Sequence, residues 1–203
     1  MYNKPIIVFE GIEGSGKTTH LKNITSYLKQ RKVKYISLRE PGGSKNSEKI
    51  RKLILDKKSN FDQFTDLLLY LASRNENVQK TIKKYYKKKI ILIDRFSNST
   101  FAYQHYGMGI DYKIINIINK YILKKIKPDF IFLSTVKLKE MKKRLKFRKK
   151  NNRYDEFKIS FYRKVQNGFI KMLKNNKNVE IIDTSDTLEN NKNQILERIK
   201  KLI

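Results

Sequence analysis

The segment from Gly11 to Thr18 holds the residues whose types and spacing most clearly indicate chemistry. It reads GIEGSGKT and fits G-x-x-x-x-G-K-[ST], a phosphate-binding loop (P-loop) whose backbone N–H groups surround phosphates. In this pattern Lys17 contacts the β- and γ-phosphates, and the hydroxyl of Thr18 binds Mg²⁺. The sequence therefore predicts a nucleoside triphosphate site. The residues expected to bind the triphosphate are Gly11, Ile12, Glu13, Gly14, Ser15, Gly16, Lys17 and Thr18.

A carboxylate and a cation follow an apolar run further along the chain. Residues 91–93 are apolar and lead into Asp94, and such a carboxylate is typical of an acid that orients a metal ion or a water. Many strands end in Asp, so the pattern alone is weak. Beside a P-loop, we interpret Asp94 as a metal ligand together with Thr18. The side chain of Arg95 would place a positive charge in the same cleft. The alternative interpretation is that Arg95 forms an ion pair on the surface.

Arginines in three separated segments indicate a second ligand that is itself phosphorylated. Arg51, Arg74 and Arg95 are more cations than a triphosphate already held by a P-loop requires, whereas a kinase needs an acceptor pocket. Tyr70 lies four residues before Arg74, so both lie on one face of a helix. That spacing suits a ring that stacks on a base while the guanidinium binds the base edge. The alternative interpretation of Tyr70 is that its ring packs in the hydrophobic core, as part of the apolar run at residues 67–71.

A basic segment between two predicted helices is expected to form a lid at approximately residues 144–157. It contains Arg144, Arg148 and Arg153 among several lysines. Phosphoryl transfer is accelerated mainly by positioning and by cations near the transferred group, and lids commonly supply such cations. The alternative is a solvated basic loop.

Apolar, β-branched runs that alternate with helical patterns must position these residues. Because the runs are apolar throughout, they predict strands buried on both faces of a parallel sheet that helices cover on both sides. We expect five strands, at residues 5–9, 34–38, 90–93, 129–133 and 179–182. We expect helices at residues 18–31, 47–55, 64–85, 112–124, 138–147, 159–173 and 191–202.

These elements predict one open α/β domain over residues 1–203. In such a sheet, ligands bind at the carboxyl ends of the strands. The P-loop follows the first strand, REPGG at 39–43 follows the second, and DRFS at 94–97 follows the third. The three segments should therefore lie at one edge of the sheet.

The composition is compatible with a soluble protein inside the cell. There is no Cys, which excludes disulfides and thiolate metal sites and suits a reducing cytoplasm. We find neither a signal segment nor an apolar run long enough to span a bilayer. We therefore expect a cytoplasmic protein without a membrane partner.

The net charge of +28 is compatible with nucleic-acid binding. The basic residues, however, are mainly Lys scattered along predicted helices with Asn, Ile and Tyr, which indicates a general bias of composition. Seven of the ten Arg residues lie in or beside the segments to which we assign a function, namely Arg39, Arg51, Arg74, Arg95, Arg144, Arg148 and Arg153. Arg binds phosphate through a rigid fork that Lys lacks, so we expect these arginines to be retained because they bind phosphate in a defined geometry. We do not expect nucleic acid to be the main ligand.

Seven segments together resemble the bacterial-type thymidylate kinases over nearly the whole chain. They are residues 9–19, REPGG at 39–43, residues 68–74, DRF at 94–96, AYQ at 102–104, PD at 128–129 and NRYD at 152–155. The combination of REPGG, DRF and AYQ at these separations is highly specific. The resemblance implies the P-loop NTPase fold with a helical lid. It also implies transfer of the γ-phosphoryl group of ATP to thymidine 5′-monophosphate (dTMP), giving the diphosphate (dTDP), with Mg²⁺.

The resemblance implies roles for individual residues of the acceptor pocket. The counterpart of Tyr70, usually Phe, stacks on thymine, and that of Arg74 binds the base edge. The counterparts of Arg51 and Arg95 hold the acceptor phosphate, and Tyr103 would pack under the sugar and disfavour a ribose 2′-hydroxyl. The residues expected to bind the acceptor are Arg39, Glu40, Arg51, Tyr70, Arg74, Arg95, Ser99, Thr100, Tyr103 and Gln104.

The resemblance also implies where the catalytic charge lies. In this family the catalytic arginine sits either in the P-loop or in the lid, and Gly14 occupies the P-loop position in question. The chain therefore resembles the lid type, with Arg148 and Arg153 as candidates, while Glu13 would face the acceptor sugar and the metal. The residues expected to act in catalysis are Lys17, Arg95, Arg148, Arg153, Asp94 and Glu13.

Two positions depart from the family pattern. Met108 stands where relatives usually carry Arg, which removes a cation near the acceptor, and Ser134 stands where a strand commonly ends in Asp. Such enzymes form homodimers through helices on one face, so a homodimer is implied. Two other functions remain open, namely another P-loop kinase of a nucleoside or its monophosphate, and a basic ATP-dependent nucleic-acid-binding protein. Convergence of Arg51 and Arg95 with Tyr103 would favour a monophosphate kinase.

Overall fold

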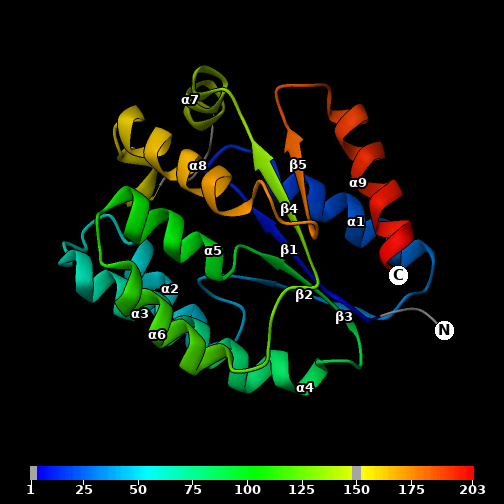
Figure 1. Cartoon of the computed structure of the whole chain (residues 1–203), viewed down its shortest axis with the longest axis horizontal. Helices are drawn as coiled ribbons and strands as arrows, with labels where there is room; N and C mark the ends of the chain where they lie inside the picture. Colours follow the sequence, from blue (N-terminus) through cyan, green and yellow to red (C-terminus); the bar gives the residue numbers. More distant parts are fainter. Residues whose placement is uncertain (1–3, 148–151) are drawn as a thin grey trace.

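Five parallel strands form one sheet in the order β2-β3-β1-β4-β5 in the computed structural model, which describes residues 4–147 and 152–203 (Figure 1). The predicted five-stranded parallel sheet is thereby confirmed, and each observed strand lies within two residues of its expected ends. The strands are β1 (Ile6–Glu10), β2 (Tyr35–Arg39), β3 (Ile90–Asp94), β4 (Phe130–Thr135) and β5 (Val179–Asp183).

Burial separates the central strands from the edge strands. All five residues of β1 are buried, and β3 and β4 are buried except for their last residues. The edge strands β2 and β5 each expose two residues and bury only one. The expectation of strands buried on both faces therefore holds for the three central strands and is wrong for the edges, where the helices cover the sheet less completely.

Alternate side chains of the sheet form two separate apolar layers. Ile7 and Phe9 pack with α1 (Lys17–Gln30) and α9 (Leu188–Leu202), which lie together beside the sheet in Figure 1. Ile6 and Val8 pack in a second cluster with the remaining helices. A strand places successive side chains on opposite faces, so an uninterrupted apolar run serves both layers. The second layer contains α2 (Lys45–Leu55), α3 (Gln63–Asn77), α6 (Tyr112–Leu123), α7 (Leu138–Lys146) and α8 (Ile159–Leu173).

The helical segments depart from the expectation at three places. The helix expected at 64–85 is α3 followed by a π-helical turn η1 (Val78–Ile82) and the short α4 (Lys83–Tyr85). The helix expected at 191–202 starts earlier, because Thr187 caps it by accepting a bond from the N–H of Asn190. Residues 97–107, which carry no predicted helix, form α5 (Ser97–Thr100) and the π-helix η2 (Phe101–Gly107).

Close packing explains the helical structure at 97–107. A Cβ atom on Gly168 of α8 would lie 2.5 Å from the side chain of Tyr106, so the glycine permits this approach. The local sequence is poor in strong helix formers, and the contact with α8 lies far along the chain, so periodicity gives no signal for it. In the described part of the chain, none of the helices combines the length and apolar character needed to cross a bilayer.

Candidate active site

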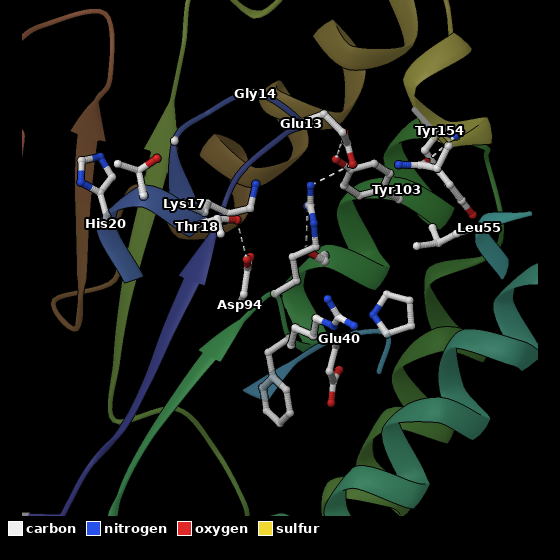
Figure 2. Close-up of a pocket in the computed structure, with 18 of the residues that line it drawn as sticks. Glu13, Gly14, Lys17, Thr18, His20, Glu40, Leu55, Asp94, Tyr103 and Tyr154 are labelled. Carbon is white, nitrogen blue, oxygen red and sulfur yellow. Dashed lines mark hydrogen bonds and ion pairs between the residues drawn. The ribbon is translucent and has the colours of Figure 1, made fainter. Parts of the chain in front are cut away.

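A cleft of about 730 Å³ lies at the carboxyl ends of the strands. In Figure 2, His20 lies at one end of the cleft, and Leu55 and Tyr154 lie at the other. All ten residues expected to bind an acceptor line this one cleft, together with Lys17, Thr18 and Asp94 of the P-loop side. The structure therefore brings the predicted donor and acceptor sites into one continuous cavity.

The P-loop joins β1 to α1 through glycines in positive-φ conformations. Gly14 has φ 68° and Gly16 has φ 80°, values that favour glycine. A Cβ on Gly11 would lie 2.2 Å from the carbonyl oxygen of Ser134, so Gly11 also permits the close approach of β4. In the described residues no side chain caps the N-terminus of α1. That helix end therefore presents N–H groups and a positive dipole to an anion.

The side chain of Lys17 is folded into the P-loop. Its Nζ donates to the carbonyl oxygen of Ile12 at 2.7 Å and to Oγ of Ser15 at 3.3 Å. Burial, followed by the nearby charge of Arg95, lowers the pKa of Lys17 to about 8. A phosphate in the loop would add a negative charge beside the buried ammonium.

Thr18 and Asp94 form a pair of oxygen groups beside Lys17. Oγ1 of Thr18 donates to Oδ2 of Asp94 at 3.0 Å, a contact that Figure 2 marks. Hydroxyl and carboxylate oxygens are ligands that Mg²⁺ accepts, usually together with waters and substrate phosphates. Within residues 4–147 and 152–203 there is no cluster of three or more metal-binding side chains. The donor set thus fits a phosphate-bound Mg²⁺ better than an ion held in a cage made only of protein groups.

Glu13 connects the P-loop to the acceptor side of the cleft through Arg95 and Tyr103. Nη2 of Arg95 lies 2.9 Å from Oε1 of Glu13, and Nη1 donates to the carbonyl oxygen of Gly11 at 2.7 Å. The other carboxylate oxygen of Glu13 accepts a bond from the hydroxyl of Tyr103, whose ring lies 5.1 Å from Cζ of Arg95. Arg95 is therefore ion-paired inside the cleft and not on the outer surface.

Arg74 is buried, with 2% of its surface exposed, and binds mainly to protein groups. Its Nε donates to Glu40 at 2.8 Å, and Nη1 donates to Thr100 at 2.8 Å and to Asn119 at 2.7 Å. Nη2 donates to the carbonyl oxygen of Phe96 at 3.0 Å. Four of its five N–H groups are thus engaged by groups of the described residues. Arg74 therefore organises the pocket wall as well as lining it.

The remaining predicted acceptor residues line the cleft and differ in how far protein groups already engage them. Tyr70 lines the cleft one helical turn before Arg74 on α3 and also packs against the core, while its stacking on a base stays a prediction. Gln104 is 1% exposed, and its Nε2 has no hydrogen-bond partner in the described part of the chain. Arg51 donates to the carbonyl oxygen of Pro41 at 2.6 Å, and Arg39 forms an ion pair of 2.9 Å with Glu48.

The lid arginines separate in space. Arg144 on α7 lines the cleft and donates to the carbonyl oxygens of Gly14 at 3.0 Å and Thr184 at 2.6 Å. Arg153 instead binds Asp66 of α3 and is not among the residues that line the cleft, so its predicted catalytic role stays a prediction. Arg148, the other predicted catalytic arginine, lies outside the described residues.

Some residues in and behind the cleft wall were not singled out from the sequence. Glu10 is fully buried and accepts bonds from the backbone N–H groups of Phe96 and Ser99 and from the hydroxyl of Ser99, so it fixes the segment that carries Arg95. Burial raises its pKa to about 7. A carboxylate at the end of an otherwise apolar strand could have pointed to Glu10. The cleft lining also includes Thr184, Asp186, Leu188 and Asn191, which come from a segment far along the chain, and Thr184 lies with His20 beside Gly16.

Comparison with known proteins gives consistent matches. A family model described as thymidylate kinase matches residues 9–195. A thymidylate kinase of Mycoplasma capricolum subsp. capricolum is 38% identical over 204 aligned residues, which cover 96% of each chain. A thymidylate kinase of Sulfurihydrogenibium sp. is 40% identical over 187 residues, covering 90% of this chain and 91% of the relative.

A solved structure is also similar. The crystal structure of a thymidylate kinase from Ehrlichia chaffeensis superposes with a TM-score of 0.79 at 30% sequence identity. The match covers 97% of this chain and 98% of that one. The arrangement of sheet and helices is therefore shared over the whole domain.

Proposed function

Since this chain belongs to the thymidylate kinase family, we propose that its cleft transfers the γ-phosphoryl group of ATP to dTMP, giving dTDP and ADP. The observation that carries this function is the single cleft in which the P-loop and the arginine-lined pocket meet at Glu13 and Arg95. A coupled assay of ATP consumption against a panel of nucleoside monophosphates tests it. We expect dTMP to be the preferred acceptor, and turnover of a different monophosphate alone would contradict the proposal.

The P-loop side would hold the donor. Lys17 and the N-terminus of α1 bind the β- and γ-phosphates, and Thr18 with Asp94 would hold Mg²⁺. A bound Mg²⁺ would neutralise part of the phosphate charge. The adenine would occupy the end of the cleft near His20, because Figure 2 shows His20 on the side of Lys17 away from Tyr103.

The opposite side would hold the acceptor. Arg51 and Arg95 bind its phosphate, Tyr70 stacks on thymine, and Nε2 of Gln104 donates to a carbonyl oxygen of the base. Tyr103 packs under the sugar. The second pKa of a phosphate monoester is about 6, so the attacking oxygen is already deprotonated at pH 7 and needs no general base. The protein then acts by positioning and by charge.

Arg144 is our proposal for the cation closest to the transferred group. Its guanidinium already contacts the P-loop at Gly14, whereas Arg153 is paired with Asp66. A cation there stabilises the charge that develops on the transferred phosphoryl oxygens. Arg148 remains a second candidate.

We further propose that the protein is a homodimer and acts in the cytoplasm. The helices α3 and α6 expose several large apolar side chains, and Ile117 and Tyr121 are 67% and 79% exposed. Exposed apolar side chains on a highly charged chain fit contact with a second copy better than contact with solvent. The exposed large apolar residues of the two helices are Phe64, Leu68, Tyr112, Ile114, Ile117 and Tyr121.

A further inference from the structure

Asp66 is a buried carboxylate for which the proposed chemistry has no use. It lies on α3 with 2% of its surface exposed. Oδ1 accepts from Nη2 of Arg153, and Oδ2 accepts from the hydroxyl of Tyr154. Two consecutive residues of the 3-10 helix η3 (Arg153–Glu156) thus bind both oxygens of one carboxylate, 87 and 88 residues away in sequence. A buried charge with both oxygens bonded is costly to leave unpaired.

The same segment makes further contacts with the helices around the acceptor pocket. Nε of Arg153 donates to the carbonyl oxygen of Ile54, and Nζ of Lys57 lies 2.6 Å from Oε1 of Glu156. The hydroxyl of Tyr162 on α8 donates to the carbonyl oxygen of Tyr154. Residues 152–156 are therefore docked on α2, α3 and α8, and Asp66 is a buried carboxylate among their partners.

This docking places the ring of Tyr154 edge-on against two aromatic residues of the acceptor pocket. The centroid of Tyr154 lies 6.0 Å from that of Tyr70 and 6.2 Å from that of Tyr103, at interplanar angles of 84° and 71°. Such edge-to-face contacts restrict the planes of the rings. Tyr154 also lines the cleft at the end that Figure 2 shows beside Leu55.

We propose that Asp66 is a positioning residue for the acceptor nucleotide, acting through Tyr154 on the rings of Tyr70 and Tyr103. This inference rests on the proposed function, because it assigns that end of the cleft to the nucleoside of the acceptor. It also gives the charge of Arg153 a structural use, since the guanidinium completes the pairing of the same carboxylate.

The test is steady-state kinetics of the full chain with dTMP and ATP varied separately. Asp66→Asn keeps the shape of the side chain but replaces one carboxylate oxygen by an NH₂ group. Because both Arg153 and Tyr154 donate to this side chain, one of the two hydrogen bonds is lost. We expect the KM for dTMP to rise about tenfold, with kcat and the KM for ATP within about twofold of wild type. Tyr154→Phe removes only the hydroxyl and should also raise the KM for dTMP. If Asp66→Asn does not fold, this variant alone tests the proposal.

The double variant and a matched control make the test specific. If Asp66 acts through Tyr154, the variant that combines Asp66→Asn with Tyr154→Phe raises the KM for dTMP no more than the single variant with the larger effect. If the two residues act independently, the two fold-changes multiply. Glu156→Gln removes a carboxylate from the same segment at an exposed ion pair, and it should leave all constants within about twofold.

Two outcomes would overturn the role of Asp66. One is a KM for dTMP that stays at the wild-type value in both single variants. The other is an equal change of kcat and of both KM values, which indicates a general effect on the fold. A wild-type protein that phosphorylates no nucleoside monophosphate would instead overturn the proposed function itself.

Discussion

Thr18 on the first turn of α1 donates a hydrogen bond of 3.0 Å to Asp94 at the end of β3. The two residues are 76 positions apart in the sequence: Thr18 follows β1 through the P-loop, and Asp94 is the last residue of the neighbouring strand β3. This pairing of a P-loop hydroxyl with a strand-end carboxylate defines where Mg²⁺ would sit, and it leads to the first prediction.

Asp94→Asn should lower kcat by about a hundredfold or more, because the amide removes the negative charge that would hold Mg²⁺. The Mg²⁺ concentration for half-maximal rate should rise as well, and a Mg²⁺ titration of the phosphoryl-transfer rate measures both. Asp111→Asn, at the exposed start of α6, is a control for loss of a carboxylate. A normal Mg²⁺ dependence in Asp94→Asn would contradict the assignment of the metal site.

Binding of ATP near pH 8 should be accompanied by uptake of about half a proton. Burial lowers the pKa of Lys17 to about 8 in the ligand-free cleft, so about half of the molecules carry a neutral amine at that pH. Bound phosphate favours the charged form and raises this pKa, so the affinity for ATP should decrease as pH rises above 8. Calorimetric titrations in buffers with different ionisation enthalpies measure the uptake.

Lys17→Arg is the control for this proton uptake, because its guanidinium stays charged throughout the range. The uptake attributed to Lys17 should disappear in this variant, even if binding weakens. Equal uptake in both proteins would assign the proton to another group.

Arg144→Ala should reduce kcat/KM for ATP by about tenfold to a hundredfold. The change removes a cation from beside Gly14 and breaks the bonds that join α7 to the P-loop and to Thr184. Arg163→Ala, on an exposed position of α8, removes the same charge away from the cleft and should have little effect. An unaltered rate in Arg144→Ala would leave Arg148 as the candidate for the catalytic cation.

Ile117→Glu combined with Tyr121→Glu should convert the protein to a monomer. Both side chains are largely exposed on α6, and charges placed there would be buried without partners in a dimer. Sedimentation velocity of wild type and variant measures the change. Phe147→Glu, at a residue that directly follows α7 and is 79% exposed, should sediment like wild type. A wild-type protein that sediments as a monomer would contradict the proposed dimer.

Features that depend on near neighbours in the chain could be predicted from the sequence. The P-loop, the five strands and the shared helix of Tyr70 and Arg74 follow from patterns only a few residues long, because periodicity and turn chemistry are local. The gathering of REPGG and DRF at one edge also followed, since the carboxyl ends of parallel strands must lie together.

Pairings between distant segments needed the tertiary structure. The sequence by itself determined a parallel α/β sheet with a P-loop and a set of arginines near its carboxyl edge. Only the fold decided that Arg144 contacts Gly14, while Arg153 binds Asp66 87 residues away. Both arginines stand in one basic segment with no local difference that marks their partners. The packing of α7 and η3 against different elements fixes which cation reaches the P-loop and which one is neutralised by a buried carboxylate.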